Sequence, residues 1–357
     1  MTTQEADEGS DVQADPQWFV AQLRRLLTAC GAGTASKLAA RKKEKPDRYY
    51  QERMPHSTIS NALSPLRQDL PSADVTRRFV ARCVEYADEH GFPLPPQDRD
   101  VERWLWLLSR VDKEIKEVAH ETAVEVVLKW SELIDLNSWK KIFRKSLMPP
   151  FGLPFATQDR LGSTLTWMIK RDWPESFPKV SNAFRNFQDV LDELLNFFVH
   201  QSFFSSTAED FYEIRDDSTR YSPRIDREKF HQAEREYFEN TLFFERMLQE
   251  LNAAANHVCD MVRMELDSTF RAKSGLLTLT HYSEGGIFTR RWVYSPELRE
   301  RVHPYAGSAA LREEVRDTIR TAAEGPGGQC ARQRRVTHEP SDSALSPGDA
   351  PASQEEP

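Results

Sequence analysis

The sequence predicts a mainly α-helical protein with an N-terminal helical bundle, a larger helical body and one β-hairpin near the C-terminus. The helices are predicted by apolar residues that recur three and four positions apart over long segments. The hairpin is predicted by two runs of β-branched and aromatic residues that flank Ser-Glu-Gly-Gly at positions 283–286.

Length and composition are those of a globular protein. The 357 residues suffice for two or three folding units, and the hydrophobic fraction of 39% is ordinary. No window approaches eighteen consecutive apolar residues and the N-terminus is polar, so we expect a cytoplasmic protein without a membrane span or a secretory signal. The four cysteines are Cys30, Cys83, Cys259 and Cys330. They lack paired CxxC spacing, which argues against structural zinc or a disulfide framework and predicts that three of the four are small buried residues.

Charge is distributed unevenly along the chain. The formal net charge is -8, yet positions 24–67 carry ten basic and three acidic residues. A basic module on an acidic chain is the pattern expected of a protein with one face for a polyanion. Residues 1–15 contain five acidic and no basic residues and predict a disordered leader.

Four helices are expected in the basic module, residues 16–91. The first begins at Pro16 and ends at Gly31, and Thr34 caps a second over residues 35–42. A third begins near His56, and a fourth begins at Ser72 or Asp74 and ends near Gly91.

The third helix has the pattern of an element that approaches DNA. Ile59 and Leu63 share one face, while short hydrogen-bonding side chains and no acidic residue lie on the others. Such side chains suit the edges of bases in a major groove lined by phosphates. The alternative is an ordinary helix start, since Ser57 and Thr58 after Pro55 also look like an N-terminal cap.

Several segments together resemble the phage-repressor type of helix-turn-helix domain, in a variant found at the N-termini of actinobacterial proteins. They are GAGTASKLA at 31–39, PHSTISNAL at 55–63, LPS at 70–72 and RFVARC at 78–83. The resemblance implies double-stranded DNA as the partner. It makes His56, Ser57 and Asn61 base-facing with Thr58 and Ser60 flanking them, and it makes Ser36 and Lys37 phosphate-facing.

The chain departs from the simple repressors in its turn, which is about a dozen residues long instead of about four. The insertion is basic, so its side chains are also candidates for phosphate contacts. The expected phosphate-facing residues therefore also include Arg41 at the end of the second helix and Lys43 and Arg53 in the insertion. The competing interpretation is a helix-turn-helix fold that binds protein and does not bind DNA.

Residues 92–100 are rich in proline and predict a linker to a helical body over residues 101–310. The body begins with an a/d seam in which apolar residues alternate steps of four and three. This seam predicts either a homodimer helix or packing onto the helices that follow. Its residues are Trp104, Leu108, Val111, Ile115 and Val118.

Further along, the apolar load of residues 183–204 predicts a buried helix, and residues 205–221 are polar and predict a loop. A long helix over residues 227–266, broken near Asn240, is followed by the hairpin at 276–294. Residues 251–270 and the hairpin resemble a C-terminal region of actinobacterial proteins, a resemblance that implies no activity. Residues 321–357 predict a disordered tail.

One polar stripe in the body is a candidate site: Asn252, Asn256, Asp260 and Arg263 follow one another at steps of four, four and three. The alternative is an internal polar network. His231 with Glu234 lacks the second histidine of a helical zinc site, and the sequence has no nucleotide-binding or nucleophile motif.

We therefore expect a DNA-binding transcriptional regulator with a sensing or self-association body, and neither an enzyme nor a cofactor or metal. An interaction or scaffold protein is the alternative. An enzyme in the helical body is a third hypothesis, which requires a polar pocket around Asn256 and Asp260.

Overall fold

The computed structural model describes residues 15–39, 54–65, 69–173, 175–205, 210–283 and 286–324. These residues are mainly helical, and their few strands are short and antiparallel, so the predicted fold class is confirmed. The chain divides into two compact units, with Thr122 as the last residue of unit 1 and Ala123 as the first of unit 2. Residues 1–14 of the expected leader and residues 325–357 of the expected tail lie outside the described residues, whereas Asp15 caps the first helix. The tail prediction is wrong for residues 321–324, which form the end of the helix that begins at Ser308.

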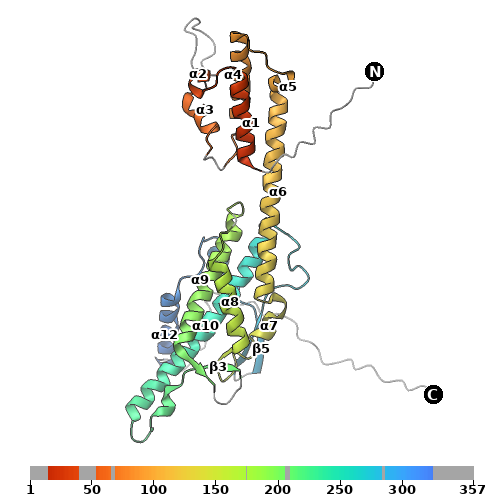
Figure 1. Ribbon diagram of the computed structural model, residues 1–357. Helices are drawn as coiled ribbons and strands as arrows, with labels where there is room; N and C mark the ends of the chain where they lie inside the picture. Colours follow the sequence, from red (N-terminus) through yellow and green to blue (C-terminus); the bar gives the residue numbers. More distant parts are fainter. Residues whose placement is uncertain are drawn as a thin grey trace, which may run out of the picture. The chain divides into compact units, whose positions relative to one another are not determined.

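Unit 1 is a helical bundle built around α4, which contacts α1, α2, α3 and α5 (Figure 1). Asp15 caps α1 by accepting a hydrogen bond from the backbone N–H of Gln17, and Ser72 caps α4 in the same way from Val75. Gly91 ends α4 at a φ of 71°, which a glycine adopts without strain. The helices are α1 (Pro16–Ala29), α2 (Ala35–Ala39), α3 (His56–Ala62), α4 (Ala73–His90), α5 (Pro96–Arg99) and the first part of α6 (Val101–Leu133).

The segment expected to be a linker, residues 92–100, belongs to unit 1. It contains α5, and Leu94 is buried in the same core as α1 and α4. Gly31 leaves space for the start of this segment, because a Cβ at position 31 would lie 2.2 Å from the ring of Phe92. The chain thus divides after Thr122 and not after Gly91, since prolines shape this segment without detaching it.

The a/d seam of α6 also packs differently from either expectation. Trp104, Leu108 and Val111 are buried with the helices that precede α6, and the Trp104 ring meets Phe19 edge-on with centroids 6.3 Å apart. These three side chains are therefore already covered within one chain and are not free to form a homodimer seam. Val118, at the end of the seam, is 52% exposed.

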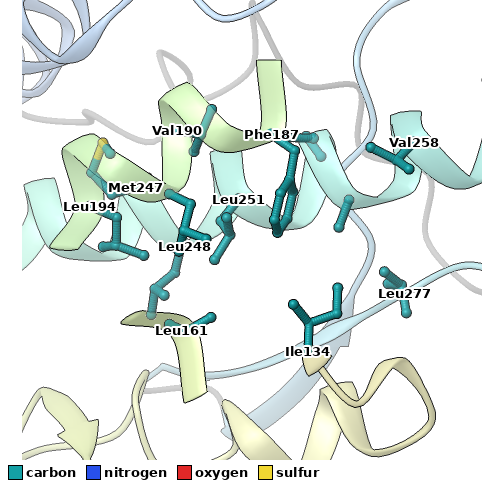
Figure 2. Packing of buried hydrophobic residues seen from close by; sticks show 14 of the residues in the cluster. Ile134, Leu161, Phe187, Val190, Leu194, Met247, Leu248, Leu251, Val258 and Leu277 are labelled. Atoms are coloured by element: carbon teal, nitrogen blue, oxygen red, sulfur yellow. The ribbon is translucent and has the colours of Figure 1, made fainter. Parts of the chain in front are cut away.

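Unit 2 is organised around α9 and α10, which pack along each other. Figure 2 shows Phe187, Val190 and Leu194 of α9 against Leu248 and Leu251 of α10. α10 is continuous, without the break expected near Asn240. The helices of this unit are the end of α6, η2 (Leu136–Ser138), α7 (Trp139–Ile142), α8 (Phe155–Ile169), α9 (Pro178–Gln201), η3 (Asp217–Arg220), α10 (Arg227–Glu265), α11 (Pro296–Arg299) and α12 (Ser308–Glu324).

The expected hairpin is present as β4 (Leu279–Ser283) and β5 (Gly286–Arg290), with His281 opposite Phe288. A second sheet was not expected: β1 (Gly152–Pro154), β3 (Phe211–Ile214) and β2 (Ser202–Phe204) pair in that order, all antiparallel. The loop prediction for residues 205–221 is wrong, because β3 and η3 lie there. The buried-helix prediction holds as far as Phe198, whereas Phe203 and Phe204 lie on β2 and are exposed.

Candidate nucleic-acid interface

α2 and α3 form the helix pair that the sequence predicts, and their apolar residues fix them to unit 1. Leu38 of α2 and Ile59 of α3 have no exposed surface, and Ala62 is 1% exposed. Leu38 and Ile59 lie in one core with Phe79 and Val80 of α4. α3 is therefore seated on a rigid support, with its polar residues on the remaining surface.

The polar residues of α3 differ in exposure. His56, Ser57 and Asn61, the three expected to face bases, are exposed, whereas Thr58 and Ser60 are half-buried. The Ser60 hydroxyl lies 3.3 Å from Nε2 of His56, one turn away on the same face. α3 carries no acidic residue, so nothing on it repels a phosphate.

α2 begins as expected, because Oγ1 of Thr34 accepts a hydrogen bond from the backbone N–H of Lys37 at 3.3 Å. Ser36 and Lys37, the two expected phosphate contacts on this helix, are exposed. The other three, Arg41, Lys43 and Arg53, lie outside the described residues, as do most of the basic residues counted at positions 24–67. The expected turn between the helices lies there too.

Two arginines hold the C-terminal ends of α2 and α3. Nε of Arg24, on α1, donates to the backbone oxygen of Leu63 at 2.9 Å, and its Nη2 donates to the same oxygen. Nε of Arg82, on α4, donates to the backbone oxygen of Leu38 at 3.2 Å. A cation at a helix C-terminus is favourable because it satisfies a free carbonyl and the negative end of the helix dipole. Each helix is thus anchored by a residue of the supporting bundle.

Sequence reasoning missed both anchoring roles. In the sequence, Arg24 is only one member of the basic excess, and no pattern marks Arg82 as an anchor. Arg24 and Leu63 are 39 residues apart and Arg82 and Leu38 are 44 apart, so no local pattern connects them. The available signal was chemical: carbonyls at the ends of short helices need donors.

In unit 2 the structure brings the polar stripe together as an internal network. Asn256 is 1% exposed and donates from Nδ2 to the backbone oxygens of Leu277 and Trp292, both at 3.0 Å. Its Oδ1 accepts from the Leu277 N–H at 2.8 Å, and Oδ1 of Asn252 accepts from the Trp292 N–H at 3.2 Å. The two amides thus tie α10 to the chain on both sides of the hairpin.

The outer half of the stripe is an ion-pair cluster. Arg263 pairs with Oδ1 of Asp260, and Nη1 of Arg299 lies 3.5 Å from Oδ2 of the same carboxylate. With the asparagines engaged by backbone, the arrangement corresponds to the internal-network alternative.

His257 lies beside this network and is the most perturbed histidine of unit 2. It is 5% exposed, and burial lowers its pKa from the ordinary 6.5 to about 4. Its Nδ1 has no hydrogen-bond partner among the described residues, and its ring meets Tyr294 edge-on. His257 is accordingly neutral at pH 7.

The cysteines behave as expected where the structure describes them: Cys30, Cys83 and Cys259 are free and buried. Cys30 and Cys83 are hydrogen-bonded to each other in the core of unit 1, which lowers the pKa of the Cys30 thiol to about 7. Nδ1 of His231 lies 3.3 Å from Oε2 of Glu234 on an exposed surface. Within the described part of the chain, no three His, Cys, Asp or Glu side chains are grouped to hold a metal ion.

Among the described helices none is sufficiently long and apolar to span a membrane. Comparisons with known proteins give no assignment: no family model, no curated protein and no solved structure matches the chain.

Proposed function

We propose that the chain is a DNA-binding transcriptional regulator of the cytoplasm whose unit 1 binds double-stranded DNA through α3. One observation carries the proposal: α3 exposes His56, Ser57 and Asn61, has no acidic side chain, and is held from beneath by Ile59 and from its C-terminal end by Arg24. A recognition helix needs this combination of a polar exposed face and a rigid support.

In this mechanism the two helices have different tasks. Lys37 and Ser36 of α2 contact phosphates, which supplies affinity and fixes the orientation of α3. Asn61 is suited to adenine, because its amide offers one donor and one acceptor to the N6 and N7 edge. Each well-placed base contact contributes discrimination of roughly 1 to 3 kcal/mol. Unit 2 senses a ligand or a partner.

The test is a selection of bound sequences from random DNA by the full chain, followed by affinity measurements on the enriched duplex. We expect Lys37→Glu to weaken binding to every duplex, because it places a negative charge beside the phosphates. Asn61→Ala should reduce the preference for the enriched sequence while leaving affinity for unrelated DNA nearly unchanged. Lys140→Glu, an exposed charge reversal in unit 2, is the matched control.

The alternative function is an interaction protein whose helix pair does not bind DNA. One feature of unit 2 favours it, namely the apolar side chains exposed beside the α8–α9 contact, with Phe155 50% and Val199 61% exposed. The same experiment separates the two functions. Unchanged binding at low salt after Lys37→Glu and Asn61→Ala together, or no enriched sequence, would falsify the regulator.

A further inference from the structure

A cavity of about 360 Å³ lies in unit 1 between α1, α5 and α6. We call it the arginine–tryptophan cavity. Two helix faces line it, and each presents residues spaced three and four apart, which keeps them on one side of the helix. These residues are Trp18, Gln22 and Arg25 on α1, and Arg103, Trp106 and Arg110 on α6.

The inner wall of the cavity is rigid. Trp104 lines it while being only 4% exposed, and its Nε1 donates to the backbone oxygen of Asp98 at 3.2 Å. The same indole ring contacts Phe19 edge-on in the core. The cavity is therefore preformed by packing, as small-molecule sites usually are.

Positive charge predominates among the lining residues. Asp98 is their one acidic member, against three arginines. Its Oδ1 lies 4.0 Å from Nη1 of Arg103, and Arg110 pairs with Glu114 at 3.2 Å. Arg25 has no ion pair or hydrogen bond among the described residues. The cavity thus offers a guanidinium that no acidic side chain of the described chain engages.

An aromatic surface lies next to this charge. Trp106 is 57% exposed, which is unusual for so large an apolar side chain, and the guanidinium of Arg110 lies over it at 5.6 Å from the ring centroid. Exposed indole rings beside arginines are suited to stack planar rings, as in proteins that bind bases.

We propose that the arginine–tryptophan cavity binds a small molecule that joins a planar aromatic ring to a phosphate, with a nucleoside monophosphate as its simplest form. The ring stacks on Trp106, and the phosphate accepts hydrogen bonds from Arg25 and Arg103. A phosphate monoester presents three free oxygens and close to two negative charges, so it suits guanidinium groups from two helices better than a carboxylate, which has two oxygens and one charge. The volume lies near the lower end of the range for small-molecule sites, about 300 to 1,000 Å³, which favours a mononucleotide.

The site is distinct from α3 and does not depend on DNA binding. Its test is calorimetric titration of the full chain with adenosine monophosphate, adenosine and inorganic phosphate in separate experiments. We expect the nucleotide to bind at least tenfold more tightly than either fragment, since ring and phosphate act together.

Arg25→Gln should weaken nucleotide binding roughly tenfold or more, through loss of a charged hydrogen bond, and should leave adenosine binding unchanged. Trp106→Ala should weaken both. Both side chains are exposed, so neither variant disturbs the core, and circular dichroism checks this. The matched control is Arg171→Gln, because Arg171 lies over Trp167 at 4.7 Å in unit 2 and outside the cavity.

The proposal is overturned if the nucleotide does not bind at millimolar concentration, or if Arg25→Gln and Arg171→Gln have equal effects. Tighter binding of indole-3-carboxylate than of the nucleotide overturns the phosphate assignment. DNA binding is measured separately on the selected duplex, so failure here leaves the proposed function untouched.

Discussion

Replacing Asn256 by alanine should destabilise unit 2 far more than an average substitution. This side chain makes three hydrogen bonds to the backbone of segments on either side of the hairpin, one with the Leu277 N–H and two with the carbonyls of Leu277 and Trp292. All of them lie in a region where Asn256 itself is 1% exposed. Alanine can replace none of them.

The magnitude follows from what is left behind. Each buried backbone group that loses its partner costs about 1 to 3 kcal/mol, and Asn256→Ala leaves three of them. Some of this cost is recovered if water enters the space of the missing amide, so we expect a loss of about 4 kcal/mol in the free energy of unfolding. A domain is stable by only about 5 to 15 kcal/mol, so the variant should be close to unfolding at physiological temperature.

Urea unfolding of the full chain, followed by near-ultraviolet circular dichroism, measures this loss. Hydrogen exchange localises it: the amides of β4 and β5 should exchange faster, because the hairpin is held to α10 by this network. Asn196→Ala, an exposed asparagine of α9, is the control and should change stability by less than about 0.5 kcal/mol. A loss below about 1 kcal/mol for Asn256→Ala, or unchanged hairpin exchange, would refute the reasoning.

Two further predictions concern Arg24 and His257. Arg24→Lys keeps the positive charge but loses the forked contact with the Leu63 oxygen. It should therefore weaken binding to the selected duplex about fivefold, as much as Arg24→Ala does, when affinity is measured by fluorescence anisotropy. Wild-type affinity of the Arg24→Lys variant would instead indicate that Arg24 is a simple phosphate contact. Because burial lowers the pKa of His257 to about 4, the unfolded chain binds a proton below pH 6.5 that the folded chain does not, so stability should fall by about 3 kcal/mol from pH 7 to pH 4. His257→Gln should make this pH dependence shallower in urea unfolding, and an unchanged slope would assign it to other groups.

The sequence predicted those parts of the fold that depend on local pattern. The caps at Thr34 and Ser72, the end of α4 at Gly91 and the hairpin all follow from the chemistry of neighbouring residues, and the structure has each of them. The apolar spacing of α9 likewise predicted its burial as far as Phe198.

Where the sequence failed, the deciding contacts are distant along the chain. The seam of α6 shows a periodic apolar face, but periodicity does not say which surface covers that face, and the preceding helices cover it. β3 is a short strand in a polar segment, and it pairs on one side with β2, which is near in sequence, and on the other with β1, which is far away in sequence. The prolines of segment 92–100 predict a linker because they exclude long helices, yet they do not prevent Leu94 from reaching the core.

At the candidate interface too, the sequence predicts what local spacing determines and misses contacts between residues distant along the chain. Helical spacing alone separates the exposed His56, Ser57 and Asn61 from the buried Ile59, whereas the anchoring of α3 by Arg24 appears only once the bundle is assembled. Likewise the spacing of Asn252 and Asn256 predicted a shared face but not that backbone from the hairpin region fills it.

The anchoring role of Arg24 lowers the number of positive charges in unit 1 that are available to contact DNA phosphates. With its guanidinium on the Leu63 oxygen and that of Arg82 on Leu38, neither is free to sit on a phosphate, and Lys37 is the one lysine or arginine of α2 and α3. Binding through these helices alone would then show a logarithmic salt slope of about -1, since each neutralised phosphate contributes about -0.9. A slope of -4 or steeper would require further basic residues, and the largest group of them lies at positions 40–53, which flank α3 in sequence. A salt series on the selected duplex therefore measures how much of the affinity belongs to that insertion, and neutralising its lysines and arginines should return the slope to about -1.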